Sequence, residues 1–397
     1  MTTTGTTSRQ TISRKKKGGK TRTRKVIDWL HRWLGLVSGI VVFIVCLTGC
    51  LFVFSEEIAN VVYKKERFVT PGSQVLPLST LQKTAQEAIG KDKPIKYFSL
   101  SREPDRTWEF TAYSMNDSAI TYAGMVNYYR TAYVNPYTGK VTVVMDDKWE
   151  FFHVVKYMHW SLLLNTPYGQ PIVGWSTFIF VVLLITGLVM WWPKKWNRKN
   201  REDSFTIRWK ARFKRLNYDL HNVLGFYSLL VALVLAFTGM VFSFRWFMAI
   251  VYVLASGTIK PPPPEPVLKS KVLVQTPAMS GLDVAYQSAL QIIPQARRFS
   301  VSPAKGKDGV IAIAGYRGKE TYYDYDNLSF DQYSGKLLYR NNYTQRNRGV
   351  KLISMDYDIH VGAIAGLPGK IIAFMASLVC TSLPVTGFII WWGKRKK

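Results

Sequence analysis

Cysteine and acidic residues are both scarce in this chain of 397 residues. Its three cysteines, Cys46, Cys50 and Cys380, all lie within long apolar runs. We therefore expect them to pack as small side chains and expect no disulfide framework outside these runs, even in an oxidising compartment. No Gly-x-Gly-x-x-Gly motif, P-loop or flavin signature is found, so electrons for any redox reaction would have to come from another protein or from membrane quinol.

Long apolar runs, by contrast, occur four times. A helix of roughly 20 residues crosses a hydrocarbon core about 30 Å thick. Backbone polar groups find no water in lipid, so each run must be helical. The first run is too long, and too far from the first residue, for a cleaved signal peptide. The four predicted spans are Leu34–Phe54, Ile172–Trp192, Leu224–Phe244 and Ile371–Trp392.

Basic residues outnumber acidic ones by 53 to 25, and they gather beside the spans. Nine lie in residues 1–27, ten in residues 193–216 and four in the last four residues. By the positive-inside rule these segments are cytoplasmic. The net charge of +28 is then a topology signal that also attracts anionic lipid, and we expect no nucleic-acid partner. An interfacial aromatic belt is predicted on the same side, at Trp191, Trp192, Trp196, Trp391 and Trp392.

The segments between the spans resemble each other. Ser79-x-Leu81 and Ser280-x-Leu282 open stretches with helical spacing, each with a serine where an N-cap is expected. Alternating strands follow, and each segment then has a hairpin signal, Tyr137-Thr-Gly-Lys140 or Tyr333-Ser-Gly-Lys336. We expect two small α+β modules outside the cytoplasmic membrane.

Four of the five histidines also fall at matching places in the two halves. His31 and His221 each begin a span that closes on Thr-Gly, and His159 and His360 each precede a span that also closes on Thr-Gly. The chain is thus predicted to be a duplicated unit with its histidines duplicated. The four dipeptides are Thr48-Gly49, Thr238-Gly239, Thr186-Gly187 and Thr386-Gly387.

The direction of the spans predicts how these histidines pair. Spans one and three both start inside, which places His31 with His221, and spans two and four start outside, which places His159 with His360. Haem iron accepts an imidazole on each face, so the pattern predicts one haem near each surface. Two histidines on one iron leave no vacant position, which favours electron transfer. The alternative is that the histidines merely anchor helix ends at the interface. His153 has no counterpart, and we interpret it as structural or substrate-facing.

Two further features bear on the outer pair. The motifs Asn165–Pro171 and Gly366–Gly369 are expected to break the helices that lead into spans two and four. His159 and His360 would then lie on short segments near the outer interface. The outside modules are rich in residues that could hold a bulky chelate or simply form a sheet core: Tyr97, Trp108, Tyr128, Tyr129, Arg130, Arg297, Arg298, Tyr316, Tyr322 and Tyr323.

Taken together, these motifs resemble a known family. The residues that carry the resemblance are Leu30-His31-Arg-Trp-Leu-Gly, Met158-His159-Trp, Asp219-Leu-His221 and Ile359-His360, together with the hairpin motifs. The chain is similar to the PepSY-associated transmembrane-helix proteins, an iron-regulated inner-membrane group that includes FoxB-type ferrisiderophore reductases. The resemblance implies haem b in a bacterial inner membrane and reductive release of iron from a periplasmic ferric siderophore.

The expected architecture is a membrane α-helical protein with four transmembrane helices as a two-fold repeat and two extracytoplasmic PepSY-like modules. The expected activity is that of a ferrisiderophore reductase that receives its electrons from a cytoplasmic reductase or from quinol. Two alternatives stay open: a non-enzymatic membrane protein that binds or regulates a peptidase, and a transporter. The expected divisions are a basic tail 1–25, span one 26–55, module one 56–155, a histidine segment with span two 156–193, a cytoplasmic loop 194–216, span three 217–250, module two 251–355, and a histidine segment with span four and basic tail 356–397.

Overall fold

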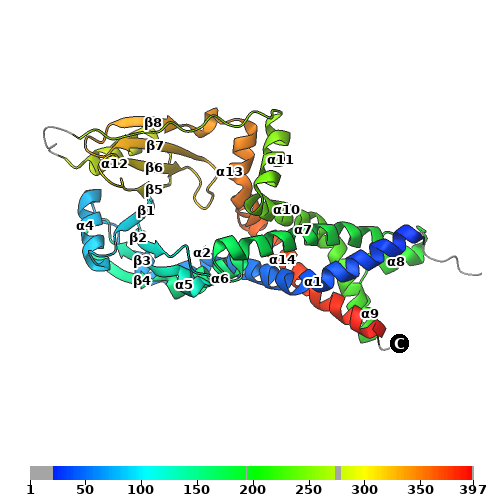
Figure 1. Ribbon diagram of the computed structural model, residues 1–397. Helices are drawn as coiled ribbons and strands as arrows, with labels where there is room; N and C mark the ends of the chain where they lie inside the picture. The colour runs from blue at the N-terminus through cyan, green and yellow to red at the C-terminus, as the bar shows by residue number, and fades with distance from the viewer. Residues whose placement is uncertain (1–20, 194, 273–278, 396–397) are drawn as a thin grey trace, which may run out of the picture.

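The computed structural model describes residues 21–193, 195–272 and 279–395. Most of the basic tail predicted at 1–25 lies outside these residues. Four helices in the described part are long and apolar enough to cross a membrane, as the sequence predicted. They are α1 (Arg22–Val53), α7 (Thr166–Trp191), the continuous helix Phe213–Ser243 and α14 (Gly366–Arg395). The chain is therefore a multi-pass membrane protein, and these helices run side by side in Figure 1.

The third span is built from three pieces. Helix α9 (Phe213–Asp219) passes into a single π-helical turn, η2 (Leu220–Leu224), before α10 (Gly225–Ser243). His221 lies in that turn. Turns of this kind are rare and are often found at functional sites.

Short helices precede spans two and four, as predicted. These are α6 (Phe151–Ser161) and α13 (Arg348–His360), and the chain breaks after each one. The predicted position of the breaks is wrong: they come a few residues before the motifs, and Pro171 lies inside α7. A proline in the first helical turn loses no intrahelical hydrogen bond. Pro167 and Pro368 thus lie in the first turns of α7 and α14.

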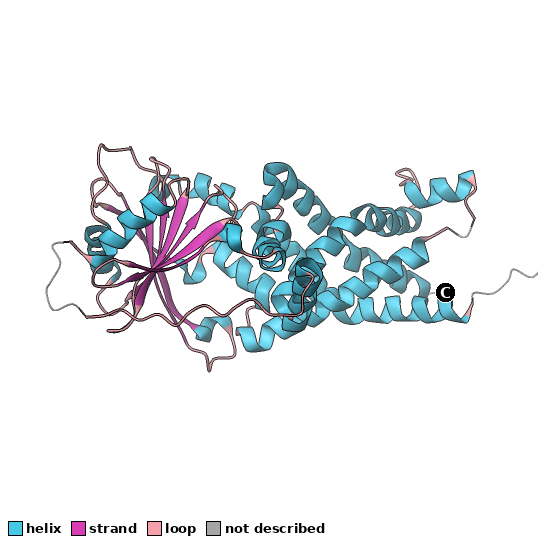
Figure 2. Ribbon diagram, turned by 90° about the horizontal axis from the view of Figure 1, so that it is seen from above, coloured by secondary structure: helices cyan, strands magenta, loops and turns pink. Residues whose placement is uncertain are grey.

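The eight strands of the described residues form one antiparallel sheet. The order is β4-β3-β2-β1-β5-β6-β7-β8, and β1 pairs with β5 through Phe98↔Val301 and Leu100↔Phe299. The two expected modules therefore share a sheet, which lies at one end of the helical bundle (Figures 1 and 2). The strands are β1 (Ile95–Ser101), β2 (Trp108–Met115), β3 (Val126–Val134), β4 (Val141–Asp146), β5 (Arg298–Ser302), β6 (Val310–Tyr316), β7 (Tyr325–Asp331) and β8 (Leu337–Asn341).

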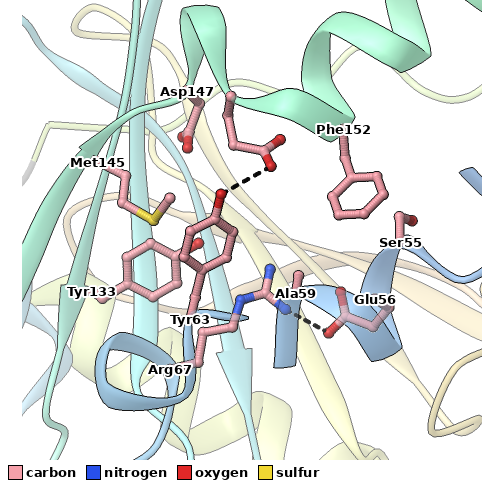
Figure 3. A pocket seen from close by; sticks show the side chains of 10 residues that line it. Ser55, Glu56, Ala59, Tyr63, Arg67, Tyr133, Met145, Asp147 and Phe152 are labelled. Carbon is pink, nitrogen blue, oxygen red and sulfur yellow. Dashed lines mark hydrogen bonds and ion pairs between the residues drawn. The ribbon is translucent and has the colours of Figure 1, made fainter. Parts of the chain in front are cut away.

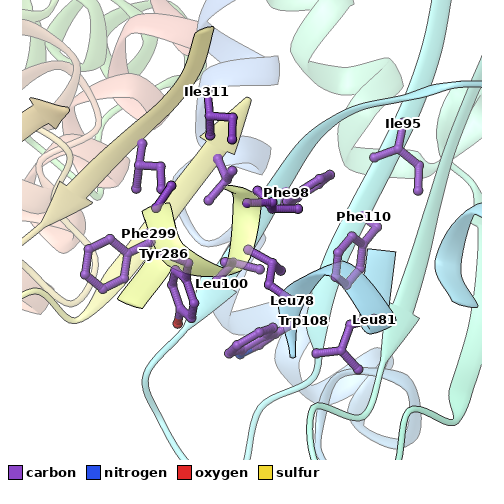
Figure 4. Packing of buried hydrophobic residues seen from close by; sticks show 14 of the residues in the cluster. Leu78, Leu81, Ile95, Phe98, Leu100, Trp108, Phe110, Tyr286, Phe299 and Ile311 are labelled. Atoms are coloured by element: carbon purple, nitrogen blue, oxygen red, sulfur yellow. The ribbon is translucent and has the colours of Figure 1, made fainter. Parts of the chain in front are cut away.

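One hydrophobic core joins the two halves of the sheet. Helices α4 (Leu78–Ile89) and α12 (Gly281–Ile292) pack over it, and Phe98, Phe110 and Phe299 are fully buried beneath them (Figure 4). Ser280 caps α12 as predicted. The N-cap prediction for Ser79 is wrong, because α4 begins at Leu78 and Ser79 instead binds the carboxylate of Asp283 on α12, with its Oγ 2.5 Å from Oδ2.

The two predicted hairpins are confirmed. Gly139 between β3 and β4 has φ 73°, and Gly335 between β7 and β8 has φ 68°. Each glycine N–H donates to the carbonyl of the residue four positions earlier, Asn135 or Asp331. Positive φ at these turns is the reason for glycine.

Shorter helices connect the spans to the sheet. Helices α2 (Ser55–Val62) and α11 (Arg245–Ser256) continue from the C-terminal ends of spans one and three. The buried Lys370 of α14 lies 2.6 Å from Glu57 of α2 and 3.1 Å from Glu320 of the β6–β7 loop, which links span, connector and sheet. The remaining short elements are α3 (Lys64–Arg67), α5 (Tyr122–Met125), η1 (Asp147–Trp149), α8 (Arg198–Phe205), η3 (Tyr343–Gln345) and η4 (Ala363–Ala365).

Candidate functional site

The four repeated histidines lie in two pairs, in the arrangement that the span directions predicted. The ring centroids of His31 and His221 are 6.4 Å apart, with the rings nearly perpendicular at 87°. Those of His159 and His360 are 5.9 Å apart at 65°. His31 and His221 belong to spans one and three, whereas His159 and His360 lie at the ends of α6 and α13.

Each histidine is held by a threonine of another span. His31 Nδ1 lies 2.9 Å from Thr186 Oγ1, and His221 Nδ1 lies 2.9 Å from Thr386 Oγ1. At the other pair, His360 Nδ1 is 2.8 Å from Thr238 Oγ1. The fourth contact joins His159 Nδ1 to Thr48 Oγ1 at 3.3 Å and to the Val45 carbonyl at 2.8 Å.

These contacts fix which ring nitrogen carries the proton. The Oγ1 of each threonine also donates to a carbonyl of its own helix, as Thr186 does to Val182 at 2.7 Å and Thr386 to Ser382 at 2.9 Å. Thr48 and Thr238 do the same, to Ile44 and Val234. A hydroxyl has one proton, so its oxygen must accept from the imidazole N–H. Nδ1 is thus the protonated nitrogen, and Nε2 has a free lone pair for a metal.

The glycine after each threonine provides space for the ring. A Cβ added at Gly387 would lie 3.2 Å from His221 Cε1, and one at Gly187 or Gly49 would lie 3.3 Å from the corresponding atom of its histidine. At Gly239 the same separation would be 3.7 Å. The Thr-Gly dipeptides mark the repeat in the sequence. In the structure they form the contact sites of the four imidazoles, which we call the threonine-glycine seats: the threonine contacts Nδ1 and the glycine leaves room for the ring. Sequence reasoning missed this role, although the dipeptide's fourfold recurrence was a signal for it.

The spacing of each pair fits one metal ion between two imidazoles. Imidazole nitrogen binds a metal at roughly 2.0–2.1 Å, and the ring centre lies about 1.1 Å further back. Two imidazoles with Nε2 on opposite sides of one ion would therefore have centroids about 6.3 Å apart. The observed separations of 5.9 and 6.4 Å bracket that value. Among the described residues no group of three histidine, cysteine or acidic side chains could hold a metal. Haem suits a site with only two protein ligands, because its porphyrin supplies the other four.

A cavity of about 430 Å³ adjoins His159 and His360. Residues from deep in the spans give it an apolar floor, including Val42, Phe180 and Ala236. Polar residues also line it where α6 and α13, the helices before spans two and four, contribute Lys156 and Tyr357. A flat, largely apolar cofactor with polar groups at one edge matches such a cavity.

His153 does not line this cavity. It is buried at 8% exposure, and its ring stacks on Tyr157 at 5.2 Å and lies against Tyr129 at 4.5 Å. Burial, helped by the charge of Lys156, lowers the pKa of His153 to about 3. The histidine therefore packs as a neutral ring, which fits the structural one of the two roles predicted for it.

The aromatic and basic residues predicted for chelate binding fall on both faces of the sheet. Trp108 belongs to the core, where it contacts Tyr286. On the other face, the guanidinium of Arg298 lies 4.8 Å from the ring centre of Tyr316 and 4.2 Å from that of Tyr322. Tyr322 in turn contacts the cavity residue Tyr357 at 5.3 Å, so ring contacts connect this face with the cavity.

A second, polar pocket of about 160 Å³ lies where α2 meets the sheet (Figure 3). Arg67 pairs with Glu56 at 3.0 Å, and Tyr63 donates to Glu150 at 3.3 Å. Burial raises the pKa of Asp147 in this pocket to about 7. The pocket holds charged side chains but none of the four paired histidines.

Comparison with known families gives one match. The family model described as the PepSY-associated TM region matches residues 29–394, which is nearly the whole chain and includes all four paired histidines. No curated protein matches the chain.

Proposed function

The chain belongs to the family of PepSY-associated transmembrane proteins, and from that premise we propose that it is a dihaem membrane reductase. It would pass electrons from the cytoplasmic side of a bacterial inner membrane to a periplasmic ferric siderophore, releasing ferrous iron, as a FoxB-type member of the family. The observation that carries the proposal is the pairing of four histidines, each with Nδ1–H held by a neighbouring helix and Nε2 free.

Haem b bound at each pair would supply one-electron chemistry with no open iron position. His31 and His221 would hold the inner group and His159 and His360 the outer group. Seventeen residues of α1 separate His31 from Thr48, which contacts the outer pair. At the helical rise this is about 25 Å, so the two pairs lie near opposite surfaces of the membrane.

A two-fold internal repeat would give the proposed arrangement a simple origin. In each half, the Thr-Gly dipeptide of the second span contacts a histidine of the first span. The dipeptide of the first span contacts a histidine of the short helix before the second span, and the two halves together complete both pairs. We infer that a duplicated unit with PepSY-like outer segments produced this arrangement. A positive-inside orientation would put the sheet in the periplasm, with Arg298, Tyr316 and Tyr322 on a face suited to a bulky polar chelate.

The first experiment measures haem in the purified protein. We expect a low-spin b-type spectrum and close to two haems per chain by pyridine haemochrome. His221→Ala should remove the inner haem alone and His360→Ala the outer haem alone, while His153→Ala, a matched buried histidine, should leave both. Protein that is colourless when made in haem-replete cells would contradict the proposal.

The second experiment tests direction and substrate. Dithionite-reduced protein should be reoxidised by ferric siderophores added at the periplasmic face, and a chelator should trap ferrous iron. Arg298→Gln should slow this step without changing the inner haem's spectrum. If no ferric chelate reoxidises a protein that does contain haem, the reductase assignment is wrong and a peptidase-binding or transport role gains support.

A further inference from the structure

The cavity beside His159 and His360 is also lined by two polar residues whose presence histidine ligation does not explain. Helix α6 presents Lys156 to the cavity three residues before His159, and α13 presents Tyr357 three residues before His360. Residues three apart lie on the same helix face. A cation and a phenol thus flank the cavity from opposite helices, each beside a histidine.

The residues that line the cavity change from mostly apolar in its deep part to polar near α6 and α13. Its deep part consists of small or apolar side chains from the spans, whereas Tyr157, Thr166 and Tyr357 lie at the outer end. Among the described residues that line the cavity, Lys156 alone carries a charge. An occupant that matches this gradient has an apolar body and an anionic edge.

The nearest acidic groups act on Lys156 only through their charge, in the part of the chain that the structure describes. Burial lowers the pKa of Lys156 whereas Asp147 and Glu150 raise it, and its Nζ lies 5.4 Å from the ring centre of Tyr157. Carboxylate groups form strong, charge-assisted hydrogen bonds with ammonium groups. An ammonium at the rim of an apolar cavity is therefore available to a carboxylate of the occupant.

We propose that Lys156 and Tyr357 bind the propionate carboxylates of the outer haem, so that its apolar edge enters the cavity first. This inference rests on the proposed function and assigns two residues beyond the axial histidines. Lys156 would also favour the reduced state of that haem, because reduction adds negative charge beside a cation. Both residues position the haem and neither ligates its iron.

The test uses the full chain, with the inner haem as an internal control. Lys156→Gln should release the outer haem to excess apomyoglobin about tenfold faster or more, as is typical when a supporting partner is lost. The same variant should lower the outer haem's midpoint potential. Lys156→Arg should retain wild-type behaviour, and so should Lys148→Gln, which removes a nearby lysine that bonds the Ala123 carbonyl outside the cavity. Tyr357→Phe should have a smaller effect in the same direction.

A second measurement removes the carboxylates from the ligand instead of the protein. Apoprotein is reconstituted with protohaem or with its dimethyl ester, whose propionates are blocked. Wild type should hold the ester at the outer site about tenfold less tightly, and this preference should shrink in Lys156→Gln and vanish when Tyr357→Phe is added. Equal retention of both ligands by wild type would overturn the proposal while leaving haem binding intact. A wild-type protein that binds no haem would instead overturn the proposed function.

Discussion

The threonine-glycine seats explain how single residues decide the chemistry of each imidazole. Thr386→Val keeps the shape of the side chain but removes the oxygen that accepts from His221 Nδ1. We expect the affinity of the inner site for haem to fall roughly 10–100-fold, because a buried N–H loses its partner and the ring its orientation. Pyridine haemochrome with difference spectra of the two haems measures the loss.

Two variants on the same helix control this prediction. Thr386→Ser retains the hydroxyl and should retain the haem. Thr381→Val removes a hydroxyl that bonds the Ser377 carbonyl of its own helix and the Cys50 side chain of α1, neither of which touches His221, and it should leave both haems in place. Equal loss in Thr381→Val and Thr386→Val would mean that general damage to α14, and not the contact to His221, causes the effect.

Asp147 gives a pH-dependent prediction at the same scale. Burial raises its pKa to about 7, from an ordinary value of 3.8. A carboxyl group whose pKa is higher in the folded than in the unfolded protein stabilises the fold while it is protonated. This contribution is fully present below the pKa of the group in the unfolded protein, and it is lost as pH rises through its pKa in the folded protein. Asp147→Asn should therefore raise the melting temperature at about pH 8 and leave it nearly unchanged below about pH 4, as followed by thermal melts in detergent. The exposed neighbour Asp146→Asn should show no such difference, and a pH-independent gain for Asp147→Asn would contradict the assignment.

At the scale of the element, the break between α13 and α14 decides where His360 lies. Gly362 has φ 77°, and a Cβ there would meet the Gly369 carbonyl oxygen at 2.4 Å. The equivalent break after α6 places Leu162 and Leu163 at φ 56° and 57°, so the first half adopts the same left-handed region with bulkier residues. Glycine avoids a cost of roughly 1–2 kcal/mol per residue in that region.

Gly362→Ala should therefore displace the end of α13 and weaken the outer site alone. We expect loss of the outer haem signal with the inner haem retained, measured by difference spectra. Gly393→Ala, at a position in α14 where a Cβ meets nothing within 4 Å, is the matched control. Retention of both haems by Gly362→Ala would show that the break does not position His360.

At the scale of the whole molecule, the shared sheet makes the two outer segments one cooperative unit. Phe299 of β5 is fully buried in a core that also contains Phe98 and Phe110 of the first half. Phe299→Ala should cost about 3–5 kcal/mol and, because the core is common, should reduce hydrogen-exchange protection in β2 and β3 as well as in β6 and β7. Leu338→Ala, at an exposed position of β8, should have little effect. Reduced protection confined to the second half would indicate two independent modules.

Much of this architecture is determined by local sequence. The length of the apolar runs specified the four spans, because in lipid a helix satisfies the backbone hydrogen bonds within a single run. The hairpin glycines specified two turns that need positive φ. The pairing of the histidines also followed from the sequence, since alternate spans must cross the membrane in opposite directions. The N-cap at Ser79 was misassigned because an aspartate 204 residues away competes for its hydroxyl.

Only the tertiary structure decided the rest, and in each case the reason is contact between segments far apart in the chain. The pairing of β1 with β5 joins two sets of strands that each look self-sufficient in sequence. Thr186 and Thr386 contact His31 and His221, which lie 155 and 165 residues earlier in the chain. Only these contacts show that the repeated dipeptide binds an imidazole ring. The approach of Lys156 and Tyr357 to one cavity likewise depends on how α6 and α13 are folded against the spans. Local propensity carries no information about such contacts, because their energy arises only when the helices pack.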